Sequence, residues 1–300
     1  MTSLVRNGTR SLGSLGDVGP ISYGQWRYTT TELATAQQLL ETALDAGMNL
    51  IDTADVYGLG WGGAGFGEVE SLLGRVLSQA PGLRRRMVLG TKGGIRPPVP
   101  YDSSDEWLRT ACEDSLRRLR VDTIDLYQIH RPDVYAHPED VAGTLTSLRE
   151  HGKIREVGVS NHTVGQTIAL QAHLPFPIVS TQPEFSAVTL DPMRDGTLDH
   201  CMAAGIVPLG WSPLAGGRLA TGDGVRPELL MVLDQLAERE GVDRSSVALA
   251  FVLAHPSGTI PIIGTQNPAR IVASTEALDV HLDRTDVYAI VQASEGVRLP

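Results

Sequence analysis

The sequence predicts an α/β protein built as a closed (β/α)8 barrel, the TIM barrel fold, in a single domain that spans residues 1–300. Short apolar or β-branched runs alternate with longer stretches of helical spacing, which is the pattern of a parallel sheet with crossover helices. The chain has 300 residues, 42% of them hydrophobic, which is a usual size for such a barrel and enough to fill its core. About eight strand-helix pairs in this length match a closed barrel better than an open doubly wound sheet.

The expected strands are short and follow one another at spacings that leave room for a helix between them. In chain order they cover residues 18–23, 48–52, 87–91, 124–129, 155–159, 178–182, 206–210 and 259–263.

The intervening helices carry start and stop signals. One helix is expected from Thr31 to a stop at Gly47, where glycine can take the left-handed backbone conformation. Ser103 or Ser104 can cap a second helix, which has acidic residues in its first turn and basic residues in its last turn, as the helix dipole favours. The last helix is expected at residues 285–293. The apolar stripe of the second helix consists of Leu108, Cys112, Leu116 and Leu119.

Residues 1–17 precede the first expected strand and are rich in glycine and serine. They also contain Leu4, Leu12 and Leu15, which need a buried environment. We predict that this segment forms a hairpin that closes the floor of the barrel.

Composition excludes several classes of partner. The formal net charge of -10 disfavours nucleic acid and anionic membranes, so a small molecule is the expected partner. No apolar run is long enough to cross a bilayer, and no secretory signal is present at the start. Cys112 and Cys201 fit neither a metal site nor a disulfide framework, which favours the cytoplasm. No metal is expected, and we expect a monomer or weak homo-oligomer.

Polar residues stand where three expected strands end, and the active site of a barrel lies at that end. Asp52, Tyr57, Lys92 and His130 should therefore share one mouth. The Lys92 ammonium is expected to lower the pKa of Tyr57, with Asp52 balancing the charge of the lysine. His130 can donate to a carbonyl oxygen while Tyr57 acts as general acid, which suits carbonyl reduction. Taken singly, each residue also fits plain packing or a structural ion pair.

These segments resemble the aldo-keto reductases, in particular bacterial YdhF-like oxidoreductases. The matching motifs are IDTADVYG at residues 51–58, TK at 91–92 and IHRPD at 129–133. The resemblance implies a barrel that binds NADPH, or less often NADH, without a Rossmann fold, and reduces an aldehyde or ketone by hydride transfer. It makes Asp52, Tyr57, Lys92 and His130 the catalytic tetrad, with Asp52 also near the cofactor.

The resemblance also implies the cofactor-binding residues, which follow five strands. Ser160, Asn161 and Gln182 would hold the nicotinamide carboxamide, and Trp211 would stack on the ring. Arg270 would bind the 2′-phosphate of NADPH. The family's basic residue near this site is Gly264 here, and its acid and amide are Ala273 and Ser274, which weakens the preference for NADPH. The remaining predicted cofactor residues are Gly24, Gln25, Trp26, Ser212, Leu214, Gly216, Gly217, Arg218, Gly264 and Thr265.

A glycine-rich segment at residues 58–63 satisfies the spelling G-x-G-x-x-G of a dinucleotide fingerprint. It does not join a strand directly to a helix, as that fingerprint requires. We therefore interpret it as a mobile loop beside the pocket. Trp61 and Phe66 could contact substrate from this loop or anchor it to the surface.

Two other functions stay open at this point. Some barrels of this family bind a nicotinamide nucleotide as regulatory subunits with little turnover, although the complete tetrad favours an enzyme. A barrel lyase or isomerase acting on phosphorylated compounds would leave Ser160, Asn161 and Trp211 without a role. The substrate itself does not follow from the sequence, because loop shape sets specificity. The short tail after Arg270 favours an open pocket and small aldehydes or activated ketones over steroids.

Overall fold

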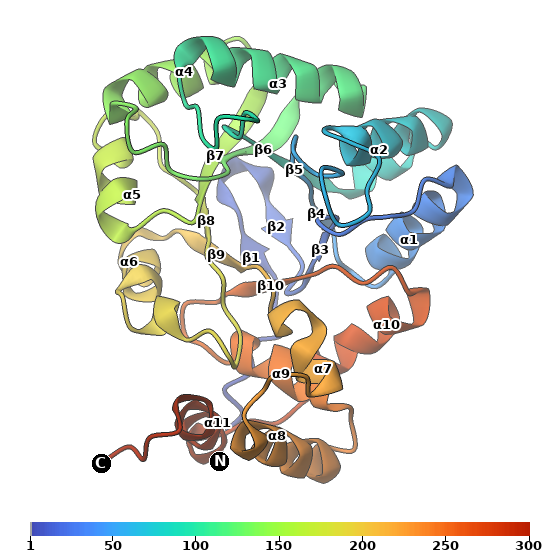
Figure 1. The fold of residues 1–300 in the computed structure, drawn as a ribbon, viewed down its shortest axis with the longest axis vertical. Helices are drawn as coiled ribbons and strands as arrows, with labels where there is room; N and C mark the ends of the chain where they lie inside the picture. The colour runs from blue at the N-terminus through green and yellow to red at the C-terminus, as the bar shows by residue number, and fades with distance from the viewer. Residues whose placement is uncertain (1) are drawn as a thin grey trace.

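The computed structural model describes residues 2–300, and its strands close into a barrel around which the helices form a ring (Figure 1). All neighbouring strands of the barrel run parallel. The predicted TIM barrel is therefore confirmed. In their order around the barrel the strands are β10 (Ile260–Ile263), β3 (Ser22–Gly24), β4 (Leu50–Asp52), β5 (Val88–Gly93), β6 (Ile124–Ile129), β7 (Ile154–Ser160), β8 (Ser180–Gln182) and β9 (Val207–Gly210).

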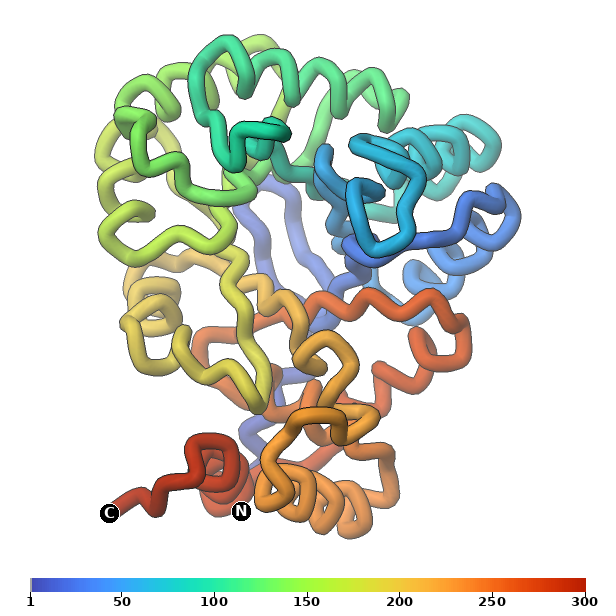
Figure 2. Tube along the Cα trace, in the orientation of Figure 1, coloured from blue at the N-terminus to red at the C-terminus, as the bar shows by residue number. Residues whose placement is uncertain are grey.

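The α-helices lie outside the strands, as the path of the chain in Figure 2 also shows. They are α1 (Leu33–Asp45), α2 (Glu68–Gln79), α3 (Asp105–Leu119), α4 (Pro138–Glu150), α5 (Val164–Gln171), α6 (Thr197–Ala204), α7 (Arg218–Thr221), α8 (Pro227–Glu240), α9 (Arg244–Leu253), α10 (Pro268–Ala273) and α11 (Arg284–Glu295). Short 3-10 helices are η1 (Gly13–Leu15), η2 (Leu83–Arg86), η3 (Asp191–Met193), η4 (Ala215–Gly217) and η5 (Ser274–Leu278).

The predicted strands from the second to the eighth overlap the observed ones and differ from them only near their ends. The first prediction, residues 18–23, was wrong for residues 18–21. Val18 belongs to an N-terminal hairpin, and β3 begins only at Ser22. The break falls at Gly19 and Pro20, because proline has no N–H for a strand ladder and glycine weakens one.

The predicted helix signals have mostly the predicted effects. The Ser104 side chain caps α3 by accepting a hydrogen bond from the backbone N–H of Trp107 at 3.3 Å, and the predicted apolar stripe of this helix is buried. Gly47 follows α1 with φ of 81°, although the helix begins at Leu33 rather than at Thr31. The last helix lies at Arg284–Glu295, around the predicted residues 285–293.

The N-terminal hairpin closes the barrel floor, as predicted. Its strands β1 (Arg10–Ser11) and β2 (Asp17–Val18) pair antiparallel and appear inside the ring of strands in Figure 1. The backbone N–H of Ser14 donates to the Glu156 carboxylate at 2.8 Å, which ties the turn to β7. Leu4 lies outside this floor. The floor cluster consists of Leu12, Val18, Leu50, Val88, Leu126, Val179, Leu209, Ile260 and Ile262, with Leu15 and Val207 packed against it.

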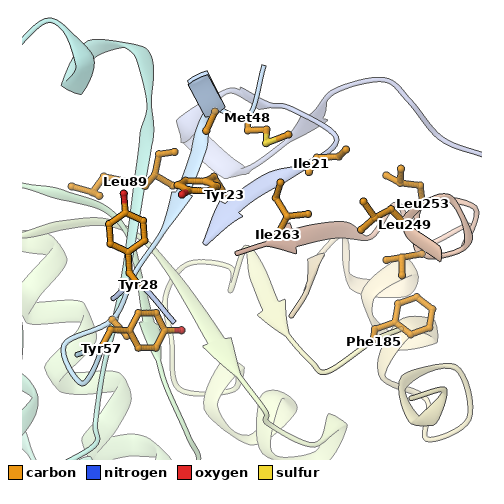
Figure 3. Packing of buried hydrophobic residues seen from close by; sticks show 14 of the residues in the cluster. Ile21, Tyr23, Tyr28, Met48, Tyr57, Leu89, Phe185, Leu249, Leu253 and Ile263 are labelled. Carbon is orange, nitrogen blue, oxygen red and sulfur yellow. The ribbon is translucent and has the colours of Figure 1, made fainter. Parts of the chain in front are cut away.

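The larger apolar core fills the layer between the barrel and its helices. Figure 3 shows part of it, with Leu249 and Leu253 of α9 packed near Phe185. Tyr57 lies at the edge of the same cluster and keeps 8% of its surface exposed. The apolar floor and core thus leave the opposite, carboxyl end of the strands for polar side chains. None of the helices within residues 2–300 combines the length and apolarity that a membrane crossing requires.

The floor yields a test of the hairpin. Leu12 is fully buried in the floor cluster, whereas Leu15 only packs against it. We expect Leu12→Ala to lower the free energy of unfolding by about 2–5 kcal/mol, the usual cost of a large cavity in a core. Leu15→Ala is the matched control and should cost clearly less in chemical denaturation. Equal effects of the two substitutions would contradict the floor assignment.

Candidate active site

A cavity of about 1090 Å³ opens at the carboxyl ends of the strands. Its inner part is lined by polar residues that end β4, β6, β7 and β8, and its outer part runs between the segments after β9 and β10. Residues that define its course are Asp52, Tyr57, His130, Ser160, Asn161, Gln182, Trp211, Gly216, Thr265 and Arg270.

The centre of the site is a buried ion pair. Asp52 ends β4 and Lys92 lies in the neighbouring strand β5, where the lysine is fully buried. The lysine Nζ donates to Asp52 Oδ2 at 2.6 Å and to the carbonyl oxygen of Thr53 at 2.9 Å. Its third neighbour is the Tyr57 hydroxyl oxygen at 3.1 Å. Three donor positions of one ammonium thus fix the aspartate and the tyrosine relative to each other.

Two glutamines hold the other oxygen of the aspartate. Gln182 Nε2 donates to Asp52 Oδ1 at 3.0 Å, and Gln128 Nε2 donates to the same atom at 3.2 Å. Sequence reasoning assigned Gln182 to the cofactor and missed Gln128. A signal was available, because Gln128 lies two residues before His130 on a strand, where alternate side chains share a face. Gln128 is a positioning residue, since it acts through Asp52.

The pKa of Tyr57 corrects one expectation. Burial raises this pKa above the ordinary value of 10.0, and the effect outweighs the lowering by the Lys92 ammonium. Lys92 thus has the predicted lowering effect on the pKa of Tyr57, but the net pKa is raised rather than lowered, because a buried phenolate would lose its hydration. Burial also opposes the charged form of Lys92, but the charges of Asp52 and Tyr57 together raise the pKa of the lysine. The site thus holds a phenol beside an ammonium.

His130 follows β6 and lies beside the tyrosine, with the two ring centroids 5.8 Å apart and nearly perpendicular. Burial lowers the pKa of His130 well below its ordinary value, and the positive charges of Lys92 and Arg131 add to this effect. The imidazole is therefore neutral near pH 7 and carries one N–H that can donate. Its Nδ1 is buried and has no hydrogen-bond partner within residues 2–300.

A chain of hydrogen bonds continues along the strand ends. Asn161 lies in the left-handed region with φ of 57°, which turns its side chain toward its neighbours. Its Nδ2 donates to Ser160 Oγ at 2.8 Å, and its Oδ1 accepts from Trp211 Nε1 at 3.0 Å. Ser160 Oγ in turn donates to the carbonyl oxygen of Gln182 at 3.1 Å. The structure therefore brings together the residues predicted to hold the nicotinamide.

Aromatic and cationic side chains cover the mouth of the cavity. The guanidinium of Arg27 lies 4.7 Å from the ring of Trp26 and 4.2 Å from that of Trp61. Trp26 lines the cavity and meets Trp211 edge to face. Trp61 and Phe66 do not line the cavity, whereas Gly58 and Leu59 at the start of the same loop do. The loop therefore borders the pocket with its first residues, and Trp61 packs against Arg27 at the surface. The loop joins β4 to α2 over a long irregular path, as expected for a false fingerprint.

The other predicted cofactor residues divide into two groups. Gln25 is buried behind the lining, and Arg218 is exposed beside it, where its Nε donates to the carbonyl oxygen of Ala215 at 3.1 Å. Their predicted roles stay predictions. Sequence reasoning missed several lining residues with polar side chains, namely Arg27, Arg131, Arg244, Ser245 and Gln266. The predicted residues that line the cavity besides those named above are Gly24, Ser212, Leu214, Gly217 and Gly264.

Comparison with known proteins agrees with this geometry. The profile described as "Aldo/keto reductase family" matches residues 20–295, which is most of the chain. The chain belongs to this family. It is accordingly an oxidoreductase, and the resemblance predicted from the motifs is confirmed.

Individual relatives span nearly the same length. This family member is 49% identical to 6-dehydroglucose reductase of Novosphingobium aromaticivorans over 295 residues, with 97% of each chain covered. It is 34% identical to the oxidoreductase YdhF of Escherichia coli, covering 92% of this chain and 94% of YdhF. The chain is also similar to a solved aldo/keto reductase of Klebsiella pneumoniae in complex with NADP and acetate. The TM-score is 0.78 and the identity is 26%, and the match covers 95% of this chain and 94% of that chain.

The raised pKa of Tyr57 predicts the pH dependence of reduction. A general acid must carry its proton, and a tyrosine holds that proton below its pKa. Since the pKa is raised above 10.0 and His130 is neutral, we expect kcat for reduction to be flat between about pH 6 and pH 9 and to fall only at higher pH. Steady-state rates at saturating cofactor measure this. A fall centred near neutral pH would show that another group donates the proton.

Proposed function

We propose that this protein reduces an aldehyde or ketone to an alcohol with NADPH, and that Tyr57 is the general acid. The observation that carries the proposal is the distance of 3.1 Å between the Tyr57 hydroxyl oxygen and Lys92 Nζ, at the inner end of a large cavity. The ammonium is held in place by Asp52, so the phenol has one fixed position.

The cavity fits a nicotinamide nucleotide. Its volume of about 1090 Å³ lies above the range of about 300–1,000 Å³ that is usual for a single small ligand. Ser160, Asn161 and Gln182 line its inner end with groups that match a carboxamide. At its outer end the guanidinium of Arg270 is exposed and makes no hydrogen bond or ion pair with the part of the chain that the structure describes.

The residues of the site account for each step that the protein itself performs. A bound reduced nicotinamide supplies the hydride that the carbonyl carbon receives. Tyr57 gives its proton to the carbonyl oxygen, and the Lys92 ammonium stabilises the phenolate that this step leaves behind. The neutral imidazole of His130 donates a hydrogen bond to the same oxygen as negative charge develops there.

The preference for NADPH over NADH rests on Arg270. A guanidinium can bind a phosphate through two parallel hydrogen bonds, and only NADPH carries a phosphate on the adenosine ribose. The Klebsiella pneumoniae relative, whose structure holds NADP, supports the same choice.

The relative at 49% identity points to the first substrate to assay. That protein is named 6-dehydroglucose reductase, so we propose an aldehyde of a sugar or of similar small size for this chain. Arg131 lines the cavity next to His130 and can bind hydroxyl oxygens of such a substrate. The alternative function, a nucleotide-binding regulatory subunit, gains no support, because the lysine, aspartate and tyrosine are fully connected.

Substitution of the proposed acid tests the mechanism. We expect Tyr57→Phe to lower kcat by about 10²–10⁴-fold, the usual contribution of general acid catalysis, because the ring stays and only the proton donor is lost. NADPH binding should be unchanged, since the hydroxyl group is directed at the substrate oxygen. Turnover of 6-dehydroglucose or a simple aldehyde, followed by NADPH absorbance, measures this. Wild-type turnover by the variant would remove Tyr57 from the mechanism.

Nucleotide titration tests the cofactor. Trp26 and Trp211 line the cavity, so quenching of tryptophan fluorescence should report binding. We expect NADPH to bind more tightly than NADH. Arg270→Ala should weaken the affinity for NADPH by about tenfold or more, as the loss of a charge-assisted hydrogen bond predicts. Binding of neither nucleotide by the wild-type protein would contradict the proposed function.

A further inference from the structure

We propose that Arg244 is a second ligand of the 2′-phosphate of NADPH and supplies the cation that is missing at Gly264. The inference deepens the proposed function and rests on it, because it requires that a nicotinamide nucleotide occupies the cavity. It identifies a residue that lies on a different element from Arg270 and is separated from it by 26 positions in the sequence.

Arg244 is the first residue of α9 and lines the same cavity as Arg270 of α10. The two elements form one wall. Ser246, in the first turn of α9, donates through Oγ to Glu276 of η5 at 3.5 Å, and η5 directly continues α10. Ser246 and Ser274 both line the cavity. Figure 1 shows α7, α9 and α10 grouped on one side of the barrel.

The end of α7 also borders this part of the cavity. Ala220 and Thr221 line the cavity there, and Gly222 caps the helix. A Cβ atom added at Gly222 would lie 3.7 Å from Arg244 Nη1. The Nη1 group therefore lies beside the last turn of α7, at the border of the outer cavity.

The side chain of Arg244 is held ready for a ligand. Its Nε donates to Asp234 Oδ1 at 2.6 Å and its Nη2 to Asp234 Oδ2 at 2.7 Å, so one edge of the guanidinium is fixed in a bidentate pair. Within residues 2–300, Nη1 makes no hydrogen bond. Only 22% of the arginine side chain is exposed, whereas 51% of the aspartate is. A guanidinium fixed on one edge loses little freedom when the other edge binds an anion.

Two acidic side chains also face this region, and both arginines keep guanidinium groups that can donate to a phosphate. Asp234 and Asp243 line the outer cavity together with Arg244 and Arg270. Asp234 is occupied by Arg244, and Asp243 is the exposed N-cap residue of α9. The free guanidinium of Arg270 and the free edge of Arg244 are thus the donors available to a phosphate. Hydroxyl groups of Ser245 and Thr265 line the same region.

The position explains why a glycine suffices at residue 264. Gly264 lines the cavity before α10 and carries no charge, although the family resemblance places a basic residue there. Arg244 lines the same cavity from the start of α9, on a different element. A phosphate with about two negative charges can accept from both arginines, whereas the hydroxyl group of NADH offers them no counter-charge.

The test compares nucleotides with and without the 2′-phosphate. Dissociation constants are measured by tryptophan fluorescence for NADPH and NADH, and for adenosine 2′-monophosphate and adenosine 5′-monophosphate as competitors. We expect Arg244→Ala to weaken NADPH and adenosine 2′-monophosphate by about 10–100-fold, as loss of a hydrogen bond to a charged group predicts. The dissociation constants of NADH and adenosine 5′-monophosphate should change less than about twofold, because neither nucleotide carries the 2′-phosphate that Arg244 would bind.

A second variant and a control separate binding from folding. Asp234→Asn keeps the arginine but weakens the clamp, so it should reduce NADPH affinity in the same direction and by a smaller factor. Arg117→Ala removes an exposed arginine of α3 that pairs with Asp114, and should alter none of the constants. Thermal unfolding of all variants shows whether the fold is kept.

The outcomes are distinct. An equal loss of NADPH and NADH affinity in Arg244→Ala, or no loss of either, would overturn the inference while leaving the proposed function intact. Wild-type protein that binds neither nucleotide would overturn the proposed function and this inference with it.

Discussion

The buried ion pair between Lys92 and Asp52 is the interaction on which the site depends. Two charges taken out of water are costly unless every polar atom around them finds a partner. Here the ammonium has the carboxylate, the Thr53 carbonyl group and the Tyr57 hydroxyl group, and the carboxylate has two glutamine amides. The strands that carry these partners are therefore locked in register at their polar ends, and the tyrosine is fixed by the same contacts.

A second buried group of charges fixes the loop that carries Tyr57. Glu70 of α2 accepts from Thr91 Oγ1 at 2.6 Å and from Arg118 Nε at 2.8 Å, so it ties β5 and α3 to the helix that follows this loop. Asp55 is buried nearby, and burial together with the charge of Glu70 raises its pKa well above the ordinary value, which favours the neutral acid. Arg118 is one of the basic residues in the last turn of α3, and it therefore also has a structural role through its ion pair with Glu70. The contacts of Glu70 with β5 and α3 thus fix the end of the loop that leads into α2.

The two ends of the barrel divide stability from chemistry. The N-terminal hairpin seals one end with Leu12 and Val18, which lie in an apolar cluster, and a hydrogen bond from Ser14 to Glu156 holds its turn. The other end collects the polar network, the cavity and the aromatic mouth. At Gly24, the last residue of β3, an added Cβ would come within 2.5 Å of Ile262 Cγ2, so a side chain has no room at this edge of the cavity. Gly24 therefore allows β3 to pack closely against β10 while its backbone lines the cavity.

The sequence by itself determined the barrel and the capped helix α3, because these follow from local periodicity and capping. The motif residues of the site followed from their places after the expected strands and from the resemblance to the aldo-keto reductases. The sequence also determined that Asp52, Lys92 and His130 end neighbouring strands. Strand alternation places Gln128 on the same face as His130. Only the tertiary structure decided that Gln128 contacts Asp52, that burial affects the pKa of Tyr57 more than Lys92 does, and that Arg244 lines the same cavity as Arg270. Desolvation and contacts between distant elements depend on how the whole chain packs, and no local pattern encodes them.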